Sequence, residues 1–228
     1  MRIFIAFFWL FLVVSSNLMA QINKIIVVKA HTKVSDYIPK KEQYRFKEFL
    51  PGQVVFKNGN TRDLELNYNI LYGEIEYIQN NDTMAILNKR EINYVVAQDT
   101  FYYDKGTIEI ISGGEIKVGL RDYYKVKDIV KEGPYGSNLR SASADTYESV
   151  SVYGNLYDLV PNETIELQRS PEYYLYTPAD GFTLFTRKNT LMLFKGKSDE
   201  IKAYLKSNKV NFESREDLLS FAAYLRTL

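Results

Sequence analysis

Residues 49–128 constrain the fold most, because short runs of alternating polar and apolar residues are separated there by turn residues. Leu64, Leu66 and Tyr68, for example, alternate with polar neighbours. Such alternation gives a β-strand one apolar and one polar face. Turn residues return about every eight to ten positions, a rhythm typical of antiparallel strands joined by short turns. The stretch therefore predicts an antiparallel β-meander, barrel-like or sandwich-like.

Two turns in this stretch carry specific predictions. Asn58-Gly59 predicts a tight type I′ hairpin between strands at residues 54–57 and 63–68, because both residue types tolerate a positive φ. Gln79-Asn80-Asn81-Asp82 predicts the next turn.

The apolar period changes from about two to about 3.6 residues at residue 187, which predicts helices. Ser198 is the predicted N-cap of one helix. Ser214 is the predicted N-cap of another, with Asp217 completing a capping box. The second of these helices has an apolar stripe at Leu218, Phe221, Ala222 and Leu225.

These patterns predict an α+β protein. The predicted parts are a signal peptide (1–20), a β-meander (21–132), a flexible loop (133–149), additional strands (150–186) and a C-terminal cap of short helices (187–228). The loop is predicted from small, polar, aperiodic residues, which bury too little apolar surface to offset the entropy of ordering.

The N-terminus has the layout of a secretory signal peptide. Arg2 precedes an unbroken apolar run at 3–14, and Ala20 suits a cleavage site before Gln21. The run is shorter than the roughly 20 residues of a membrane-spanning helix, although an uncleaved anchor is the alternative. We therefore expect export to the periplasm, the cell surface or the medium, with no transmembrane segment after cleavage.

Charge and cysteine content narrow the range of partners. Of the 29 Lys and Arg residues, Arg2 lies in the signal peptide, so the remaining 28 balance the 28 Asp and Glu. A neutral chain predicts no nucleic-acid or anionic-lipid partner, since both require a basic excess clustered on one face. The absence of cysteine excludes disulfides, thiolate nucleophiles and zinc-thiolate sites.

No catalytic motif is complete, so the sequence predicts no catalytic residue, metal site or cofactor. His31 is the only histidine, and no Ser occupies a G-x-S-x-G turn, so it is interpreted as an exposed loop residue. Gly196-Lys197-Ser198 matches the end of a phosphate-binding loop, but Leu191 stands where the first glycine is required.

Pairs of carboxylates leave one enzymatic alternative, because glycoside hydrolysis needs only two. Asp63 and Glu65 share one face of a predicted strand, and so do Glu74 and Glu76. In both pairs the shared face is the polar one, which predicts a solvated sheet surface.

Adjacent tyrosines are the candidate binding residues. Neighbours in a strand point to opposite faces, so one ring of each pair must be more exposed or lie under another element. An exposed row of tyrosines suits stacking on sugar or contact with a protein partner, and the alternative is rings that simply fill sheet surfaces. The candidates are Tyr102, Tyr103, Tyr123, Tyr124, Tyr173, Tyr174 and Tyr176.

The chain resembles a group of uncharacterised exported β-rich proteins of Bacteroidetes over about residues 44–228. The resemblance rests on segments with turn and packing character: Phe49-Leu50-Pro51-Gly52, Leu66-Asn67-Tyr68-Asn69, Asp99-Thr100-Phe101-Tyr102-Tyr103, Glu132-Gly133-Pro134-Tyr135-Gly136 and residues 188–225. It implies export and an envelope location, and it brings no functional residues with it. Asp82-Thr83-Met84 is similar to the O-glycosylation acceptor of that phylum, which makes Thr83 a candidate modification site in a predicted turn.

Two functions follow as hypotheses. The first is a noncatalytic envelope protein that acts by binding or assembly with an envelope protein or a glycan. The alternative is a glycan-active enzyme or glycan-binding protein that uses a carboxylate pair or the tyrosine-rich sheet surface.

Overall fold

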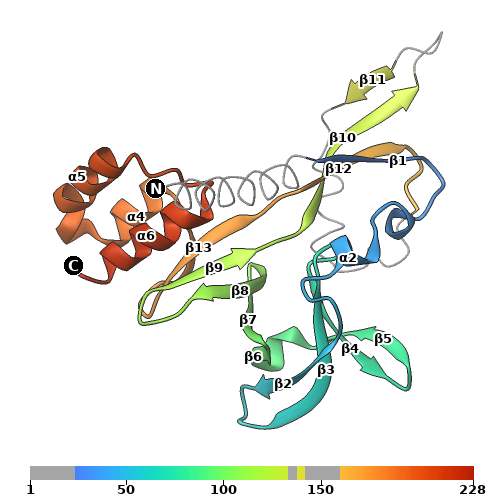
Figure 1. Ribbon diagram of the computed structural model, residues 1–228, viewed down its shortest axis with the longest axis horizontal. Helices are drawn as coiled ribbons and strands as arrows, with labels where there is room; N and C mark the ends of the chain where they lie inside the picture. Colours follow the sequence, from blue (N-terminus) through green and yellow to red (C-terminus); the bar gives the residue numbers. More distant parts are fainter. Residues whose placement is uncertain (1–23, 133–137, 142–159) are drawn as a thin grey trace, which may run out of the picture. The chain divides into compact units, whose positions relative to one another are not determined.

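The computed structural model describes residues 24–132, 138–141 and 160–228 (Figure 1). The predicted signal peptide, a strand predicted at 150–153 and most of the predicted loop lie outside the described residues.

The chain forms two compact units, each assembled from three segments. Unit 1 comprises Met1–Lys47, Tyr68–Glu74 and Asp122–Pro171, and unit 2 comprises Glu48–Asn67, Ile75–Arg121 and Glu172–Leu228. The stretch predicted as one meander thus contributes to both units. Each unit is described separately below.

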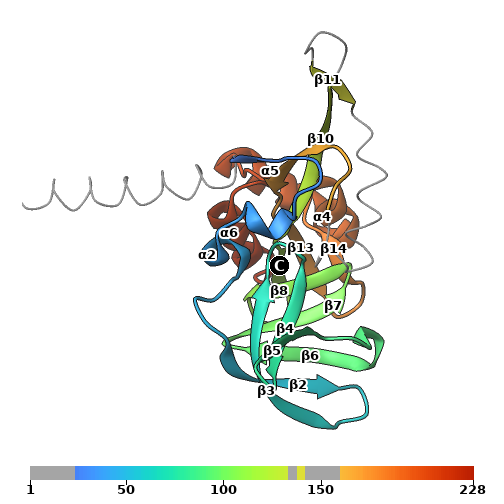
Figure 2. The same cartoon turned by 90° about the vertical axis from the view of Figure 1, so that its right-hand side faces the viewer.

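A ten-stranded antiparallel sheet dominates unit 2 (Figure 2). From one edge to the other its strands are β14 (Gly181–Leu184), β13 (Glu172–Thr177), β9 (Lys117–Arg121), β8 (Gly106–Ser112), β7 (Asp99–Asp104), β6 (Ile92–Ala97), β2 (Leu50–Phe56), β3 (Thr61–Asn69), β4 (Glu74–Gln79) and β5 (Asp82–Ala85).

The order of the strands shows two meanders joined side by side. Strands β6 to β9 follow one another in sequence and in space, as do β2 to β5, and the pairing of β2 with β6 connects the two sets. The sheet is open, with β14 and β5 as its edges. This arrangement confirms the predicted α+β class with an antiparallel meander.

The two predicted hairpin turns differ in outcome. Asn80 and Asn81 both have positive φ, at 52° and 67°, between the paired residues Gln79 and Asp82, which confirms that turn. The β2–β3 hairpin is also present, but its type I′ turn is wrong, because only Gly59 of the pair has a positive φ. The Gly59 amide donates to the Phe56 carbonyl at 3.0 Å, closing a turn that ends in a left-handed glycine.

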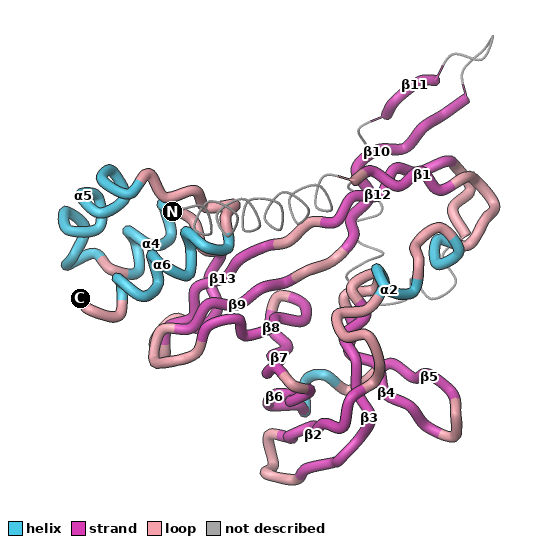
Figure 3. Tube along the Cα trace, in the orientation of Figure 1, coloured by secondary structure: helices cyan, strands magenta, loops and turns pink. Residues whose placement is uncertain are grey.

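The helices of unit 2 gather at its C-terminal end, drawn cyan beside β13 and β9 in Figure 3. They are α4 (Arg187–Leu193), the 3-10 turn η5 (Lys195–Lys197), α5 (Ser198–Asn208) and α6 (Arg215–Leu225). A separate 3-10 turn, η2 (Lys89–Glu91), precedes β6 and does not belong to this group. The predicted helical cap is therefore confirmed.

The helical cap covers one face of the sheet. The predicted stripe of α6 is buried, together with Ile201 and Leu205 of α5. These side chains pack against Val118 and Leu120 of β9 and against Tyr173 and Leu175 of β13. Burial of this apolar surface is what holds the cap on the sheet.

Of the two predicted helix N-caps, one is confirmed and the other is wrong. Ser214 Oγ accepts a hydrogen bond from the Asp217 amide at 3.3 Å, which confirms the N-cap of α6. Asp217 itself accepts from the Asn211 amide at 2.8 Å, so the reciprocal half of the capping box goes to an earlier residue. The N-cap assigned to Ser198 is wrong, because Ser198 is the first helical residue of α5 and Lys197 precedes it without a side-chain cap.

Unit 1 is built on a four-stranded antiparallel sheet. Its order is β1 (Ile25–Val28), β12 (Thr164–Arg169), β10 (Tyr124–Glu132) and β11 (Asn138–Ser141). The prediction of a flexible loop at 133–149 is wrong for residues 138–141, because these form β11 and pair with β10.

The segment before β2 contains two short helical elements. The 3-10 turn η1 (Val34–Asp36) and the helix α2 (Lys40–Gln43) flank Pro39, which takes the N-cap position. A proline at a helix N-terminus costs no hydrogen bond, so it begins the helix here and does not disrupt it. His31 is exposed in a turn, as predicted.

A carboxylate and a guanidinium meet at the start of the β10–β12 pair. Arg169 Nε donates to Asp122 Oδ1 at 2.9 Å and to Oδ2 at 3.1 Å, and the Arg169 Nη2 also donates to Oδ2. The backbone carbonyl of Asp122 accepts from the Tyr68 hydroxyl at 2.5 Å. Bidentate geometry of this kind gives strong charge-assisted hydrogen bonds. The hydrogen bonds that Arg169 donates to Asp122 raise the pKa of Arg169, against the opposing effect of burial.

Candidate binding surface

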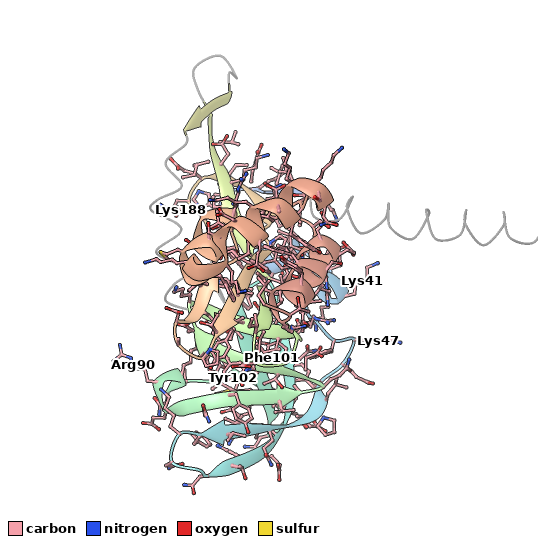
Figure 4. The ribbon with its side chains drawn as sticks, turned by 90° about the vertical axis from the view of Figure 1, so that its left-hand side faces the viewer. Lys41, Lys47, Arg90, Phe101, Tyr102 and Lys188 are labelled. Atoms are coloured by element: carbon pink, nitrogen blue, oxygen red, sulfur yellow. The ribbon has the colours of Figure 1, made fainter. Side chains whose placement is uncertain are left out.

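The strand register sorts the tyrosines of unit 2 onto two faces. Tyr102 is opposite Ile108, and Tyr176 is opposite Phe182. Tyr174 is opposite Gly119 in β9, on the same face as Tyr176. Tyr102 therefore lies on the face away from the helical cap, whereas its neighbour Phe101, labelled beside it in Figure 4, points to the other face.

Four rings on this face form a continuous row, which we call the aromatic row: Tyr94, Tyr102, Phe182 and Tyr176. The ring centroids are 5.9 Å apart for Tyr94 and Tyr102, 5.6 Å for Tyr102 and Phe182, and 5.0 Å for Phe182 and Tyr176. Each pair is tilted by 47° to 54°. Lys117 Nζ lies 4.3 Å from the Tyr176 ring centroid, within the range of a cation–π contact. The row runs from β6 to β14.

Gly119 makes room for the row. A Cβ atom at this position would lie 2.4 Å from Ile108 Cγ2 and 3.2 Å from Phe182 Cε1. The Phe182 ring can therefore lie across β9 only because residue 119 has no side chain. Lys105 Nζ donates to the Phe182 carbonyl at 3.0 Å and holds the edge strand β14 in place.

Three rings of the row are half-buried, and Phe182, which lies between Tyr102 and Tyr176, is buried. Burial raises the pKa of Tyr102, and the neighbouring hydroxyls of Tyr176 and Tyr94 raise it further. The Tyr102 hydroxyl therefore stays protonated at neutral pH and can donate a hydrogen bond. The row thus offers ring faces and edges together with phenolic donors.

Tyr174 lies on the same face as the row and is hydrogen-bonded to the carboxylate of Glu172. Its hydroxyl donates to Glu172 Oε2 at 3.0 Å, and the same oxygen is 3.4 Å from Arg121 Nη1. Burial raises the pKa of Tyr174 to about 12, and Glu172 adds to the shift, while Arg121 opposes it. A hydroxyl in this position donates to the carboxylate and loses its proton only at high pH.

The pKa of Tyr174 predicts a loss of stability at alkaline pH. The folded-state pKa is about 12 and the ordinary value is 10.0, so the fold favours the neutral phenol. Its contribution is complete below pH 10 and is lost as the pH rises from 10 to about 12. We expect the free energy of urea unfolding to fall over this range by up to about 2 kcal/mol more in the wild type than in Tyr174→Phe. If the free energy of unfolding changed equally with pH in the two proteins, the raised pKa of Tyr174 would be contradicted.

The predicted tyrosines separate into three groups. Tyr102, Tyr174 and Tyr176 share the face of the aromatic row. Tyr103 and Tyr173 lie on the opposite face, where Tyr173 packs under the helical cap. This outcome confirms that adjacent rings in a strand divide between the faces. Tyr123 and Tyr124 are both buried in unit 1.

Sequence reasoning missed three members of this surface, namely Tyr94, Phe182 and Lys117. Phe182 and Lys117 are both opposite Tyr176 in the strand register, and the Tyr94 ring contacts the Tyr102 ring. β6 and β7, like β13 and β14, are consecutive strands that pair through short turns. A register assigned from those turns was therefore the signal that would have found them.

The two predicted carboxylate pairs differ in their exposure to solvent. Asp63 and Glu65 are exposed, and Asp63 Oδ1 accepts from Gln53 Nε2 at 2.8 Å, so their solvated face is confirmed. The same prediction is wrong for Glu74 and Glu76, of which 6% and 0% is exposed. Strand alternation separates the two faces, but it does not reveal whether the polar face is covered.

Thr83 is exposed, as a modification site requires. It lies in the edge strand β5, one residue beyond the turn in which it was predicted. Glycosylation of Thr83 stays a prediction.

Comparisons of the chain with protein-family models, with curated proteins and with solved structures found no match. The resemblance to exported Bacteroidetes proteins therefore stays a prediction. In the described part of the chain, no helix is both long and apolar enough to cross a membrane. The same residues hold no group of three His, Asp or Glu side chains suited to a metal ion.

Proposed function

We propose that this chain is a noncatalytic exported envelope protein that acts by binding, and that the aromatic row is its binding surface for glycan. The observation that carries the proposal is the row itself, in which four rings from four strands lie in contact on the sheet face away from the helical cap. The signal-peptide pattern of residues 1–20 and the resemblance to exported Bacteroidetes proteins support the envelope location.

Saccharide suits this surface for two chemical reasons. The C–H faces of a sugar ring are apolar and pack on aromatic rings, while its hydroxyls need hydrogen-bond partners. The aromatic row supplies half-buried rings, and the protonated hydroxyl of Tyr102 supplies a donor. Lys117, held over Tyr176, adds a cation that suits an acidic sugar at that end of the row.

Loss of two rings is expected to weaken glycan binding. Each aromatic contact contributes about 0.5–1.5 kcal/mol, so Tyr102→Ala/Tyr176→Ala is expected to lower the affinity by roughly tenfold or more. Affinity electrophoresis in gels that contain soluble polysaccharides measures the change. The matched control is Tyr77→Ala, a half-buried tyrosine of β4 outside the row, which is expected to leave the retardation unchanged.

A conservative variant separates recognition from folding. Tyr102→Phe/Tyr176→Phe keeps both rings and is expected to retain most of the binding, with circular dichroism reporting that all variants are folded. Equal retardation of wild type and the double alanine variant in every gel would overturn the proposed site. A pull-down with the tagged protein from the native envelope then separates the two modes of action. Recovery of polysaccharide supports glycan binding, and a stoichiometric protein partner supports assembly.

A further inference from the structure

The helical cap of unit 2 contains a pocket that is separate from the aromatic row, and we call it the basic pocket. Its volume is about 590 Å³. Pockets that hold small molecules span roughly 300–1,000 Å³, so this one has room for a ligand of ordinary size. Seven residues line it: Arg187, Lys202, Leu205, Lys206, Lys209, Val210 and Phe212.

One face of α5 supplies most of the wall. Lys202, Leu205 and Lys206 follow the spacing i, i+3, i+4, which brings them to the same side of the helix, and Lys209 follows the helix directly as its left-handed C-cap. Arg187, the first residue of α4, contributes the remaining cation. The lining therefore combines four cations with three apolar side chains, and it contains no carboxylate.

Most of this positive charge is not neutralised by the protein. Lys202 Nζ is 3.1 Å from Asp199 Oδ1, but that carboxylate is almost fully exposed. Within the ranges that the structure describes, Arg187, Lys206 and Lys209 form no ion pair. Cations so close together repel one another, and an anion bound among them removes that repulsion.

Helix dipoles account for only part of the arrangement. Lys206 and Lys209 lie at the C-terminal end of α5, where a positive charge is favoured. Arg187 lies in the first turn of α4, where a positive charge is disfavoured. Its position is therefore explained better by a ligand that it shares with the lysines of α5.

The floor of the basic pocket is apolar and rigid. The Phe212 ring meets Phe185 edge-on at 6.1 Å and Phe221 at 6.0 Å between centroids. Leu205 is buried in the same core cluster. A floor fixed by aromatic packing presents a constant surface to an apolar group of a ligand.

We infer that the basic pocket binds an anionic amphiphile, with the phosphate, sulfate or carboxylate head held by Arg187, Lys206 and Lys209 and the apolar part on Phe212 and Leu205. The head can come from a membrane lipid or from a free small molecule, because both present the same chemistry. This inference does not depend on the aromatic row.

Isothermal titration of the purified protein with octyl phosphate, below its micelle concentration, tests the inference. We expect saturable one-to-one binding that is at least about tenfold tighter than binding of octyl glucoside, which lacks the charge, or of methyl phosphate, which lacks the chain. Arg187→Gln/Lys206→Gln is expected to weaken the binding of octyl phosphate by about tenfold or more. The matched control is Lys188→Gln/Lys195→Gln, which removes the same charge from exposed lysines outside the lining, one of them labelled on α4 in Figure 4.

Three results would overturn the inference: no saturable binding, equal binding of octyl phosphate and octyl glucoside, or equal losses in the two double variants. Flotation with vesicles of phosphatidylcholine, with and without phosphatidylglycerol, then identifies the source of the head group. Binding to the anionic vesicles that Arg187→Gln/Lys206→Gln abolishes supports the site with a lipid as its ligand. Binding of octyl phosphate without vesicle binding supports the site with a free amphiphile.

Discussion

Asp122→Ala is expected to lower the free energy of unfolding of unit 1 by about 3 kcal/mol. Removing one partner of a buried ion pair costs about 3–5 kcal/mol, because the other charge stays desolvated without a counterion. The side chain of Asp122 is 8% exposed and that of Arg169 is 25% exposed. Since Arg169 can recover part of its hydration, the lower end of the range applies.

The position of the pair increases the effect of losing it. Arg169 is opposite Tyr124 in the β10–β12 ladder, so the pair sits where these two strands meet. Burial raises the pKa of Tyr124, while the charge of Arg169 opposes that rise. The register makes the two side chains cross-strand neighbours. An unpaired Arg169 is expected to turn toward solvent, which would disturb this cross-strand pair.

Urea unfolding, combined with hydrogen exchange of the β10 and β12 amides, measures the effect of Asp122→Ala. The control in the same unit is Lys24→Ala, which breaks the Lys24–Glu42 pair at 3.3 Å. Because Lys24 is about half exposed, that loss is expected to cost less than about 1 kcal/mol. Asp122→Ala/Arg169→Met is expected to regain part of the stability by removing both charges. Similar costs for Asp122→Ala and Lys24→Ala would show that the pair contributes little.

The parts of the fold that the sequence predicted are those fixed by local pattern. The stripe of α6 and the Ser214 cap follow from spacing alone, and both are present. The strands of unit 2 follow from alternation and turn residues. Neither signal depends on which segments lie together in space.

The parts that were missed depend on contacts between distant segments. Glu76 looked solvated because its strand alternates, yet the polar face of β4 is covered. β11 looked like a loop because its residues are polar, yet β10 pairs with it. The division into two units requires the chain to pass between them several times, which composition does not record.

The candidate site likewise contains residues that local pattern identified and residues that only long-range contacts bring together. Tyrosine content and strand alternation identified Tyr102, Tyr174 and Tyr176, whereas assembling the row required the register of four further strand pairs. The basic pocket escaped sequence reasoning because Arg187 and the lysines of α5 belong to separate helices. Their individual signals resemble those of ordinary solvated lysines.

Phe221→Ala is expected to cost about 3–5 kcal/mol of the free energy of unfolding of unit 2. Phe221 is fully buried at the centre of the helical cap. Its ring is stacked at 5.7 Å on Phe185 and at 5.5 Å on Tyr204, and it meets Phe212 edge-on. Truncation to alanine removes three ring contacts at once and leaves a cavity that rigid neighbours fill poorly.

Urea unfolding followed by near-ultraviolet circular dichroism reports this loss, because the three rings around Phe221 change environment together when the protein unfolds. Met192→Ala, at a half-exposed position of α4, is the matched control and is expected to cost less than about 1 kcal/mol. Phe221→Leu keeps much of the volume and is expected to fall between the two. Because Phe212 rests on Phe221, the alanine variant is also expected to bind octyl phosphate more weakly, whereas Met192→Ala should bind it normally. A cost for Phe221→Ala no larger than that of Met192→Ala would mean that the cap is held to the sheet by contacts other than this aromatic core.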